Sequence, residues 1–202
     1  MMRAVLATMR PKIGIIGRGN VGSALREGLG GVGYEVRMCG NEPAAVREVG
    51  SWSDVVVLAV PFPARQEVAA RVRDDVAGKT VVDVTNALNA DYSFEPDPRR
   101  TSGAEELQGM LPQAKVVKAF NTVFAPNMRT GKVKGEVLTL FVAGDSEEAK
   151  ATVRDLARDI GFDAVDAGPL KNARWMETLG YFNIELGFGQ KMGTDIGFRL
   201  VR

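Results

Sequence analysis

The stretch Lys12–Gly22, KIGIIGRGNVG, decides the fold of this chain. Its apolar start predicts a short buried strand, and apolar residues four apart from Asn20 to about Gly30 predict a helix. The G-x-G-x-x-G pattern lies between the two, which is where such a pattern binds a dinucleotide. The glycines allow a tight turn, close approach of the pyrophosphate and close helix packing, in that order. We expect the pyrophosphate at the helix N-terminus, on Gly17, Arg18, Gly19, Asn20, Val21 and Gly22. The alternative is a glycine turn that binds nothing.

Outward from this stretch, strands and helices alternate. We expect strands at 12–17, 34–39, 54–60, 80–84, 115–120, 137–142 and 163–166, and helices at 20–30, 43–49, 64–72, 104–111, 146–160 and 170–191. The run DVVVLAV at 54–60 is continuously apolar, as in a parallel strand buried on both faces. This order predicts an α/β fold, a Rossmann-type doubly wound and mainly parallel sheet with a helical C-terminal extension. We assign residues 12–168 to the dinucleotide-binding domain and 169–202 to a C-terminal helical segment that completes a second cofactor site.

Composition narrows the chemistry. Net charge is +1, so nothing indicates binding to nucleic acid or to an anionic membrane. We expect neither a spanning helix nor a signal peptide, because the apolar runs are too short. The single cysteine, Cys39, excludes an internal disulfide and fits a cytoplasmic location, and we interpret it as a packing residue. The chain has no histidine, which excludes imidazole bases and the common zinc sites, and no metal site is expected.

The end of the second expected strand bears on dinucleotide choice. Enzymes that use NAD often place an acid there for the ribose 2′-OH, but this chain has Cys39, Gly40 and Asn41, followed by Glu42. Arg18 in the glycine loop is placed to reach a 2′-phosphate, and Arg47 is a weaker candidate. We therefore expect NADP, with NAD as the alternative. A solvated surface charge is the other interpretation of Arg18.

Several longer segments resemble a known family. These are VVVLAVP (55–61), VVDVTNALNADYS (81–93), TSGAEELQGMLPQAKVVKAFNTV (101–123) and DAGPLKNARWMETL (166–179). Together with the glycine motif they resemble the NADPH-dependent reductases of the deazaflavin coenzyme F420, and the oxidoreductase domain of six-transmembrane ferric reductases is similar too. The resemblance covers residues 12–202. It implies a Rossmann domain whose C-terminal segment closes over a second cofactor, and hydride exchange between NADPH and the deazaflavin.

The resemblance also implies roles for particular residues. Ala59, Val60 and Pro61 would line the nicotinamide ribose, Asn121 would lie beside the nicotinamide, and the segment Gly193–Phe198 would wall the second cofactor. Gly40 and Asn41 occupy the positions where these reductases carry Ser-Arg for the 2′-phosphate, and Asn121 replaces a frequent histidine. The alternatives are a flavin or another small acceptor, and a non-catalytic dinucleotide sensor.

Other polar residues allow two interpretations each. Lys118-x-x-Asn121 is similar to the lysine-asparagine pair of β-hydroxyacid dehydrogenases, but we favour a lysine at the sheet surface because too little chain follows for their helical domain. Asn86 and Asn89 are either ligand contacts at a strand end or turn residues. Asp166 and Asn172 are expected to cap the last helix.

The last expected helix is apolar on most of its surface and contains Gly180, Gly187 and Gly189. Glycine within a helix costs about 1 kcal/mol relative to alanine, so we expect a close neighbour, either another backbone or a flat ring. An apolar helix must also be buried. We therefore predict a homodimer in which residues 170–202 pack against the partner, with a core or dimer-seam role for Trp175, Met176, Leu179, Phe182 and Leu186.

Overall fold

The computed structural model describes residues 10–88, 93 and 97–202. A seven-stranded sheet in the order β2-β1-β3-β4-β5-β8-β9 forms its centre. The strands are β1 (Ile13–Ile16), β2 (Val36–Cys39), β3 (Val55–Leu58), β4 (Thr80–Asp83), β5 (Lys115–Lys118), β8 (Thr139–Gly144) and β9 (Asp163–Asp166). All neighbours run parallel except β5 and β8. The predicted Rossmann-type, mainly parallel sheet is confirmed.

The central strands bury both faces because their side chains alternate between two cores. Ile15, Val57 and Val82 belong to one core, whereas Ile16, Val56 and Val81 belong to the other. A strand with both faces buried needs apolar residues at every position, which is why continuous apolar runs marked the strands in the sequence. The register aligns the ends of β1 and β3, with Ile16 opposite Leu58.

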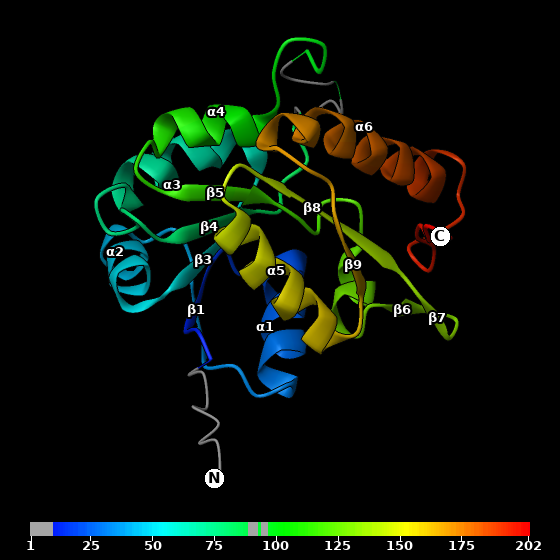
Figure 1. Cartoon of the computed structure of the whole chain (residues 1–202), viewed down its shortest axis with the longest axis horizontal. Helices are drawn as coiled ribbons and strands as arrows, with labels where there is room; N and C mark the ends of the chain where they lie inside the picture. Colours follow the sequence, from blue (N-terminus) through cyan, green and yellow to red (C-terminus); the bar gives the residue numbers. More distant parts are fainter. Residues whose placement is uncertain (1–9, 89–92, 94–96) are drawn as a thin grey trace, which may run out of the picture.

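Helices cover both faces of the sheet (Figure 1). On one side lie α1 (Asn20–Gly31) and α5 (Glu147–Ile160), and on the other α2 (Pro43–Trp52), α3 (Arg65–Val72) and α4 (Gly103–Met110). Serine side chains cap α4 and α5. Ser102 accepts a hydrogen bond from Glu105 N at the start of α4, and Ser146 accepts one from Ala149 N at the start of α5. The chain reverses between β1 and β3, so the crevice outside their carboxyl ends is the expected ligand position.

The C-terminal segment differs from the expected continuous helix. A 3-10 turn at Leu170–Asn172 precedes α6 (Ala173–Ile184), and a π-helical turn at Glu185–Gly189 ends it. Asn172 is the N-cap residue of α6, as expected, but its side chain donates to Ala167 O and makes no capping hydrogen bond. Asp166 does not cap the helix, because its carboxylate accepts from Gly168 N. Both side chains stabilise the loop before the helix instead.

Glycines in this segment contact the same chain. A Cβ on Gly180 would lie 2.3 Å from Asn86 Oδ1, and one on Gly187 would lie 2.5 Å from the ring of Phe124. Both glycines therefore have a close neighbour, as predicted, which is the side-chain amide of Asn86 at Gly180 and the ring of Phe124 at Gly187. Met176 is buried, but Trp175 and Phe182 are 61% and 51% exposed, so α6 is not buried all round in this chain.

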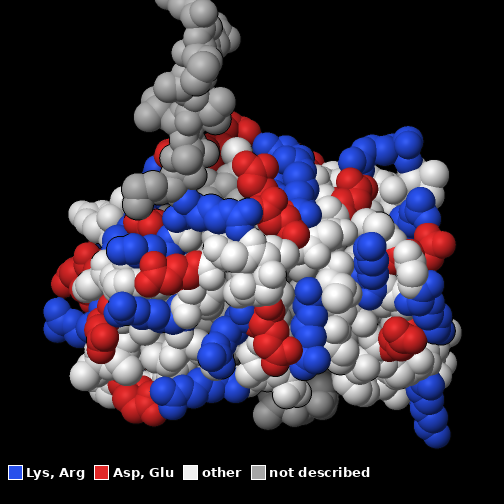
Figure 2. Space-filling view, turned by 90° about the horizontal axis from the view of Figure 1, so that it is seen from below, with Lys and Arg blue, Asp and Glu red and all other residues white. Residues whose placement is uncertain are grey.

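One feature that the sequence did not predict is a small hairpin of β6 (Lys132–Val133) and β7 (Glu136–Val137), which precedes β8. Among the described residues, no helix is both long and apolar enough to cross a lipid bilayer. Acidic and basic side chains intermingle on the face shown in Figure 2, in keeping with the net charge of +1.

Candidate functional site

The glycine loop between β1 and α1 uses its three glycines in different ways. Gly17 has a φ of +123°, and a Cβ there would lie 2.1 Å from Ala59 O. A Cβ on Gly22 would lie 2.1 Å from Gly17 O. Packing of the chain therefore requires both glycines. At Gly19, in contrast, a Cβ would meet no atom within 4 Å, so the space above this residue is open.

The open space faces the N-terminus of α1. Gly19 is the N-cap residue, no side chain caps the helix, and the first turn contains no acidic residue. The first N–H groups of a helix have no partner within the helix and carry a partial positive charge. The loop therefore presents an uncapped helix N-terminus to a space that the chain leaves free, which suits a phosphate group.

A cavity of about 310 Å³ continues from this loop across the carboxyl ends of β3 and β4. It brings together seven of the residues singled out in the sequence, which are Gly19, Asn20, Val21, Ala59, Val60, Pro61 and Asn86. Phe62, Val84 and Thr85 also line it and were not predicted as site residues. The available signals were the position of Phe62 directly after Pro61 and the position of Val84 and Thr85 within the segment 81–93, which resembles the family.

Asn86 and Asn121 form a reciprocal pair at one end of this cavity. Asn121 Nδ2 donates to Asn86 Oδ1 at 3.0 Å, and Asn86 Nδ2 donates to Asn121 O at 3.0 Å. Asn121 also donates to Met176 O, and it is only 4% exposed. Its Oδ1 is buried without a donor among the described residues. Asn86 therefore lines the cavity, while Asn121 lies behind it and fixes its amide. Asn89, the other candidate, lies outside the described residues.

The expectation of Lys118 at the sheet surface is wrong. Its side chain is fully buried, with Nζ 2.9 Å from Asp83 Oδ2, 2.7 Å from Glu177 Oε1 and 2.6 Å from Thr85 O. Burial alone would lower the pKa of this ammonium group, but the carboxylates of Asp83 and Glu177 raise it above its usual value. Lys118 is therefore protonated and fully engaged, and it does not line the cavity.

This buried ion network connects three elements. Glu177 on α6 accepts from the backbone N–H groups of Gly103 and Ala104 at 2.9 and 3.2 Å, at the start of α4. Asp83 at the end of β4 accepts from the N–H and hydroxyl of Thr85, a cavity residue. The network thus holds α6 against the carboxyl edge of the sheet and fixes the backbone that lines the cavity.

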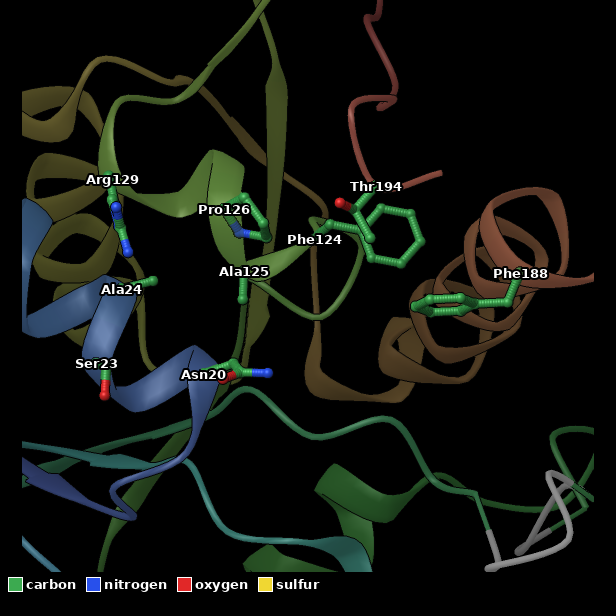
Figure 3. Close-up of a pocket in the computed structure, with 9 residues that line it drawn as sticks. All are labelled: Asn20, Ser23, Ala24, Phe124, Ala125, Pro126, Arg129, Phe188 and Thr194. Carbon is green, nitrogen blue, oxygen red and sulfur yellow. The ribbon is translucent and has the colours of Figure 1, made fainter. Parts of the chain in front are cut away.

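A second cavity, of about 440 Å³, lies on the other side of the α1 N-terminus. Figure 3 shows its residues: Asn20, Ser23, Ala24, Phe124, Ala125, Pro126, Arg129, Phe188 and Thr194. The rings of Phe124 and Phe188 meet edge to face, with centroids 5.6 Å apart. Asn20 lines both cavities, so the two spaces adjoin at the start of α1.

The C-terminal residues supply part of the second cavity wall. Thr194, within the expected segment Gly193–Phe198, lines the cavity. Asn127 Nδ2 donates to Thr194 O and Ile196 O at 2.8 and 3.2 Å. Thr139 N donates to Phe198 O at 2.9 Å. These bonds hold the end of the chain across the start of β8 and beside the cavity.

The remaining candidates lie at the carboxyl end of β2. Gly40 and Asn41 follow this strand directly, and Arg18 projects from the glycine loop with Nη1 3.7 Å from Glu42 Oε1. Arg47 pairs with Asp75 instead. Cys39 is 2% exposed, and burial raises the pKa of its thiol, as expected for a packing residue.

The sheet is doubly wound, its glycine loop is open at the topological switch point, and a cavity runs along the adjacent strand ends. These three features define the class of dinucleotide-dependent Rossmann proteins. The described residues contain no group of three or more acidic or cysteine side chains that could hold a metal ion. The sequence profile of the family described as "NADP oxidoreductase coenzyme F420-dependent" matches residues 12–87.

Individual proteins extend the match. The chain is 31% identical over 158 residues to the F420-dependent NADP reductase of Methanocaldococcus jannaschii, which covers 74% of this chain and 70% of that protein. It is 34% identical over 182 residues to the metalloreductase STEAP3 of Rattus norvegicus, covering 84% of this chain but only 36% of the relative. The crystal structure of an Arthrobacter sp. FB24 protein, provisionally assigned as an F420-dependent NADP reductase, superposes with a TM-score of 0.87 at 27% identity and covers 95% of this chain and 100% of that one.

The chain belongs to the F420-dependent NADP oxidoreductase family, to which the oxidoreductase domain of the STEAP metalloreductases is related. It is thus a member of a family of NAD(P)-dependent oxidoreductases, as its sequence predicted. The chain spans about a third of the length of STEAP3.

Proposed function

We propose that the chain transfers hydride between NADP(H) in the first cavity and a deazaflavin coenzyme of the F420 type in the second. The observation that carries this proposal is that the two cavities adjoin, with Asn20 as a shared wall. Hydride transfer requires the reacting carbons of donor and acceptor to lie about 3–3.5 Å apart. Two cavities that share Asn20 as a wall support such an arrangement.

The first cavity fits a nicotinamide dinucleotide. The open space above Gly19 and the uncapped start of α1 suit the pyrophosphate. Pro61 and Phe62 form one wall of the part that would receive the nicotinamide, and Asn86 forms part of another. Asn121 orients the amide of Asn86, which offers hydrogen bonds that a carboxamide can complement. The nicotinamide supplies the hydride when bound, and these residues would bind and orient it.

The second cavity fits a flat aromatic ring system. Phe124, Ala125, Pro126 and Phe188 give it apolar walls, and its volume of about 440 Å³ lies within the usual range of ligand sites. Such walls exclude water, which protects a reduced ring from side reactions. These walls would contact a flavin as well as a deazaflavin, because the two tricyclic rings have the same shape, so a flavin is the second candidate acceptor.

The absence of histidine and the burial of Lys118 also agree with this reaction type. Cofactors carry the electronic chemistry of hydride transfer, and the protein contributes binding, orientation and electrostatics. None of the described cavity residues is an acid or base suited to proton transfer at neutral pH. A reaction that needs a protein base, such as the oxidation of a hydroxyacid, therefore finds no support in this site.

The test is a titration of the purified chain with NADPH and oxidised F420, followed by the loss of deazaflavin absorbance. We expect turnover with F420 and none with the folded Gly19→Val variant. Flavin mononucleotide and riboflavin serve as parallel acceptors. A chain that binds NADPH but reduces F420 no faster than the Gly19→Val variant would refute the deazaflavin assignment, and faster turnover with a flavin would replace it.

We also propose that residues 169–202 act as a separate acceptor segment and that they form a homodimer contact. Phe188 and Thr194 of this segment line the second cavity. The exposure of Trp175 and Phe182 on α6 supports association, since large exposed apolar side chains on one helix favour burial by another surface. Light scattering of the purified chain tests this proposal, and a monomer at micromolar concentration with full activity would refute it.

A further inference from the structure

Two opposite charges face each other at the carboxyl end of β2. Arg18 projects from the glycine loop, and Glu42 is the N-cap residue of α2. Their side chains are 59% and 60% exposed, with Nη1 of Arg18 3.7 Å from Oε1 of Glu42. A Cβ on Gly40 would lie only 2.6 Å from Glu42 Oε2. The carboxylate therefore folds back over the strand end.

This corner of a Rossmann fold receives the ribose of the adenosine half. A carboxylate here accepts a hydrogen bond from the 2′-OH of NAD, whereas an arginine binds the 2′-phosphate of NADP. A phosphate monoester carries nearly two negative charges at neutral pH. Arg18 attracts such a group and Glu42 repels it. The chain thus places residues with opposite preferences at one corner.

A second cation near this corner, Arg71, is already engaged. Arg71 on α3 donates to the backbone carbonyl of Asn41 and also pairs with Glu67 on its own helix. Its guanidinium therefore holds the loop after β2 in place. Among the described residues, the side chain of Arg18 pairs with Glu42 alone, and such exposed ion pairs contribute little stability.

We propose that Glu42 is a specificity-determining residue that limits the selectivity of the chain for NADPH over NADH, an inference that rests on the dinucleotide site proposed above. To bind the 2′-phosphate, Arg18 must leave Glu42, and the carboxylate left beside the phosphate opposes binding. The same carboxylate accepts a hydrogen bond from the 2′-OH of NADH. The chain therefore binds both dinucleotides, with a smaller preference for NADPH than Arg18 alone would give.

The experiment compares adenosine-2′,5′-bisphosphate with adenosine-5′-monophosphate, because the pair isolates the 2′-phosphate from the nicotinamide half. Calorimetry on the whole chain gives the ratio of the affinity for adenosine-2′,5′-bisphosphate to the affinity for adenosine-5′-monophosphate. We expect Glu42→Gln to raise this ratio by roughly three- to tenfold, as for removal of one exposed charge beside a dianion. The matched control is Glu48→Gln, which removes a carboxylate of α2 that is 74% exposed and faces Arg37. The control ratio should stay unchanged.

A third variant tests the role of Arg18 directly. In Arg18→Ala/Glu42→Gln the gain should disappear, because the freed arginine is what the phosphate binds. The inference is overturned if Glu42→Gln leaves the ratio unchanged, if Glu48→Gln raises it equally, or if the full gain persists without Arg18. Titrations with NADPH and NADH separate the two proposals. A wild-type chain that binds neither refutes the dinucleotide site, whereas binding of both with a ratio insensitive to Glu42 refutes only this inference.

Discussion

Replacement of Lys118 by methionine tests the buried ion network. Methionine keeps much of the length of the side chain but removes the ammonium that contacts Asp83, Glu177 and the carbonyl of Thr85. Both carboxylates would remain, with side chains 1% and 4% exposed. Removal of one partner from a buried ion pair costs about 3–5 kcal/mol, because an uncompensated buried charge is left behind. We expect Lys118→Met to lower the free energy of unfolding by that amount at neutral pH.

A milder variant sets the scale. In Glu177→Gln, Lys118 keeps its ion pair with Asp83, and the amide oxygen still accepts from one of the N–H groups at the start of α4. We expect a loss of about 1–3 kcal/mol, the usual cost of an unsatisfied buried group. The double variant Lys118→Met/Glu177→Gln should lose less free energy of unfolding than the sum of the two single losses, by roughly 1–3 kcal/mol. The reason is that glutamine leaves one buried charge fewer beside the missing ammonium group.

Urea unfolding followed by circular dichroism measures these values. A loss below about 1 kcal/mol for Lys118→Met, or additive losses in the double variant, would contradict the network as described. The same variants separate two functions for Lys118. If it were a catalytic acid or base, as in β-hydroxyacid dehydrogenases, Lys118→Met would abolish turnover with stability unchanged.

Gly19→Val should abolish dinucleotide binding in calorimetry. It should cost only about 1 kcal/mol of stability, for the loss of a glycine N-cap, because the valine side chain enters open space. Tight NADPH binding by the folded variant would contradict the loop assignment. Gly187→Leu should displace the Phe124 ring, 2.5 Å from the new Cβ, and so weaken acceptor binding while sparing NADPH; equal losses for both would show a general unfolding effect. Burial and a hydrogen bond to Asp159 raise the pKa of Tyr34 from 10.0 to about 12. Because the folded chain then holds this proton more tightly, the contribution of Tyr34 is complete below pH 10 and is lost between pH 10 and 12, by about 2 kcal/mol once solvent screening is included. Unfolding of Tyr34→Phe should lack this alkaline loss, and an identical pH profile for both proteins would exclude the assignment.

Sequence patterns predicted the sheet because its central strands bury both faces, so their apolar runs are continuous. They failed where structure depends on few residues or distant partners. The hairpin of β6 and β7 has two residues per strand, too few for a period. The position of Lys118 was predicted wrongly because a lysine in a strand usually reaches solvent. The carboxylates that pair with it in the interior, Asp83 on β4 and Glu177 on α6, are both distant in sequence.

Part of the candidate site could also be predicted from the sequence, and part could not. The glycine loop was predicted because a tight turn, the close approach of a pyrophosphate and helix packing each restrict one position to glycine. Phe124 and Arg129, in contrast, lie directly before and at the end of a 3-10 turn (Ala125–Arg129) that follows β5 without any recurring pattern, and both line the second cavity. Of that cavity, Asn20 was predicted through the glycine motif, and Phe188 and Thr194 lie in the C-terminal segment 169–202 that was assigned to a second cofactor site.

The placement of the two cavities along the chain has an evolutionary consequence. The first cavity is built from residues 19–86, nearly the span that matches the family profile, whereas most of the second is built from residues 124–194. Under the proposed function, donor and acceptor recognition would be encoded on largely separate stretches of the gene. Mutations in the later stretch would then change the electron acceptor while the dinucleotide site is inherited intact, and among the described cavity residues Asn20, at the start of α1, would serve both halves.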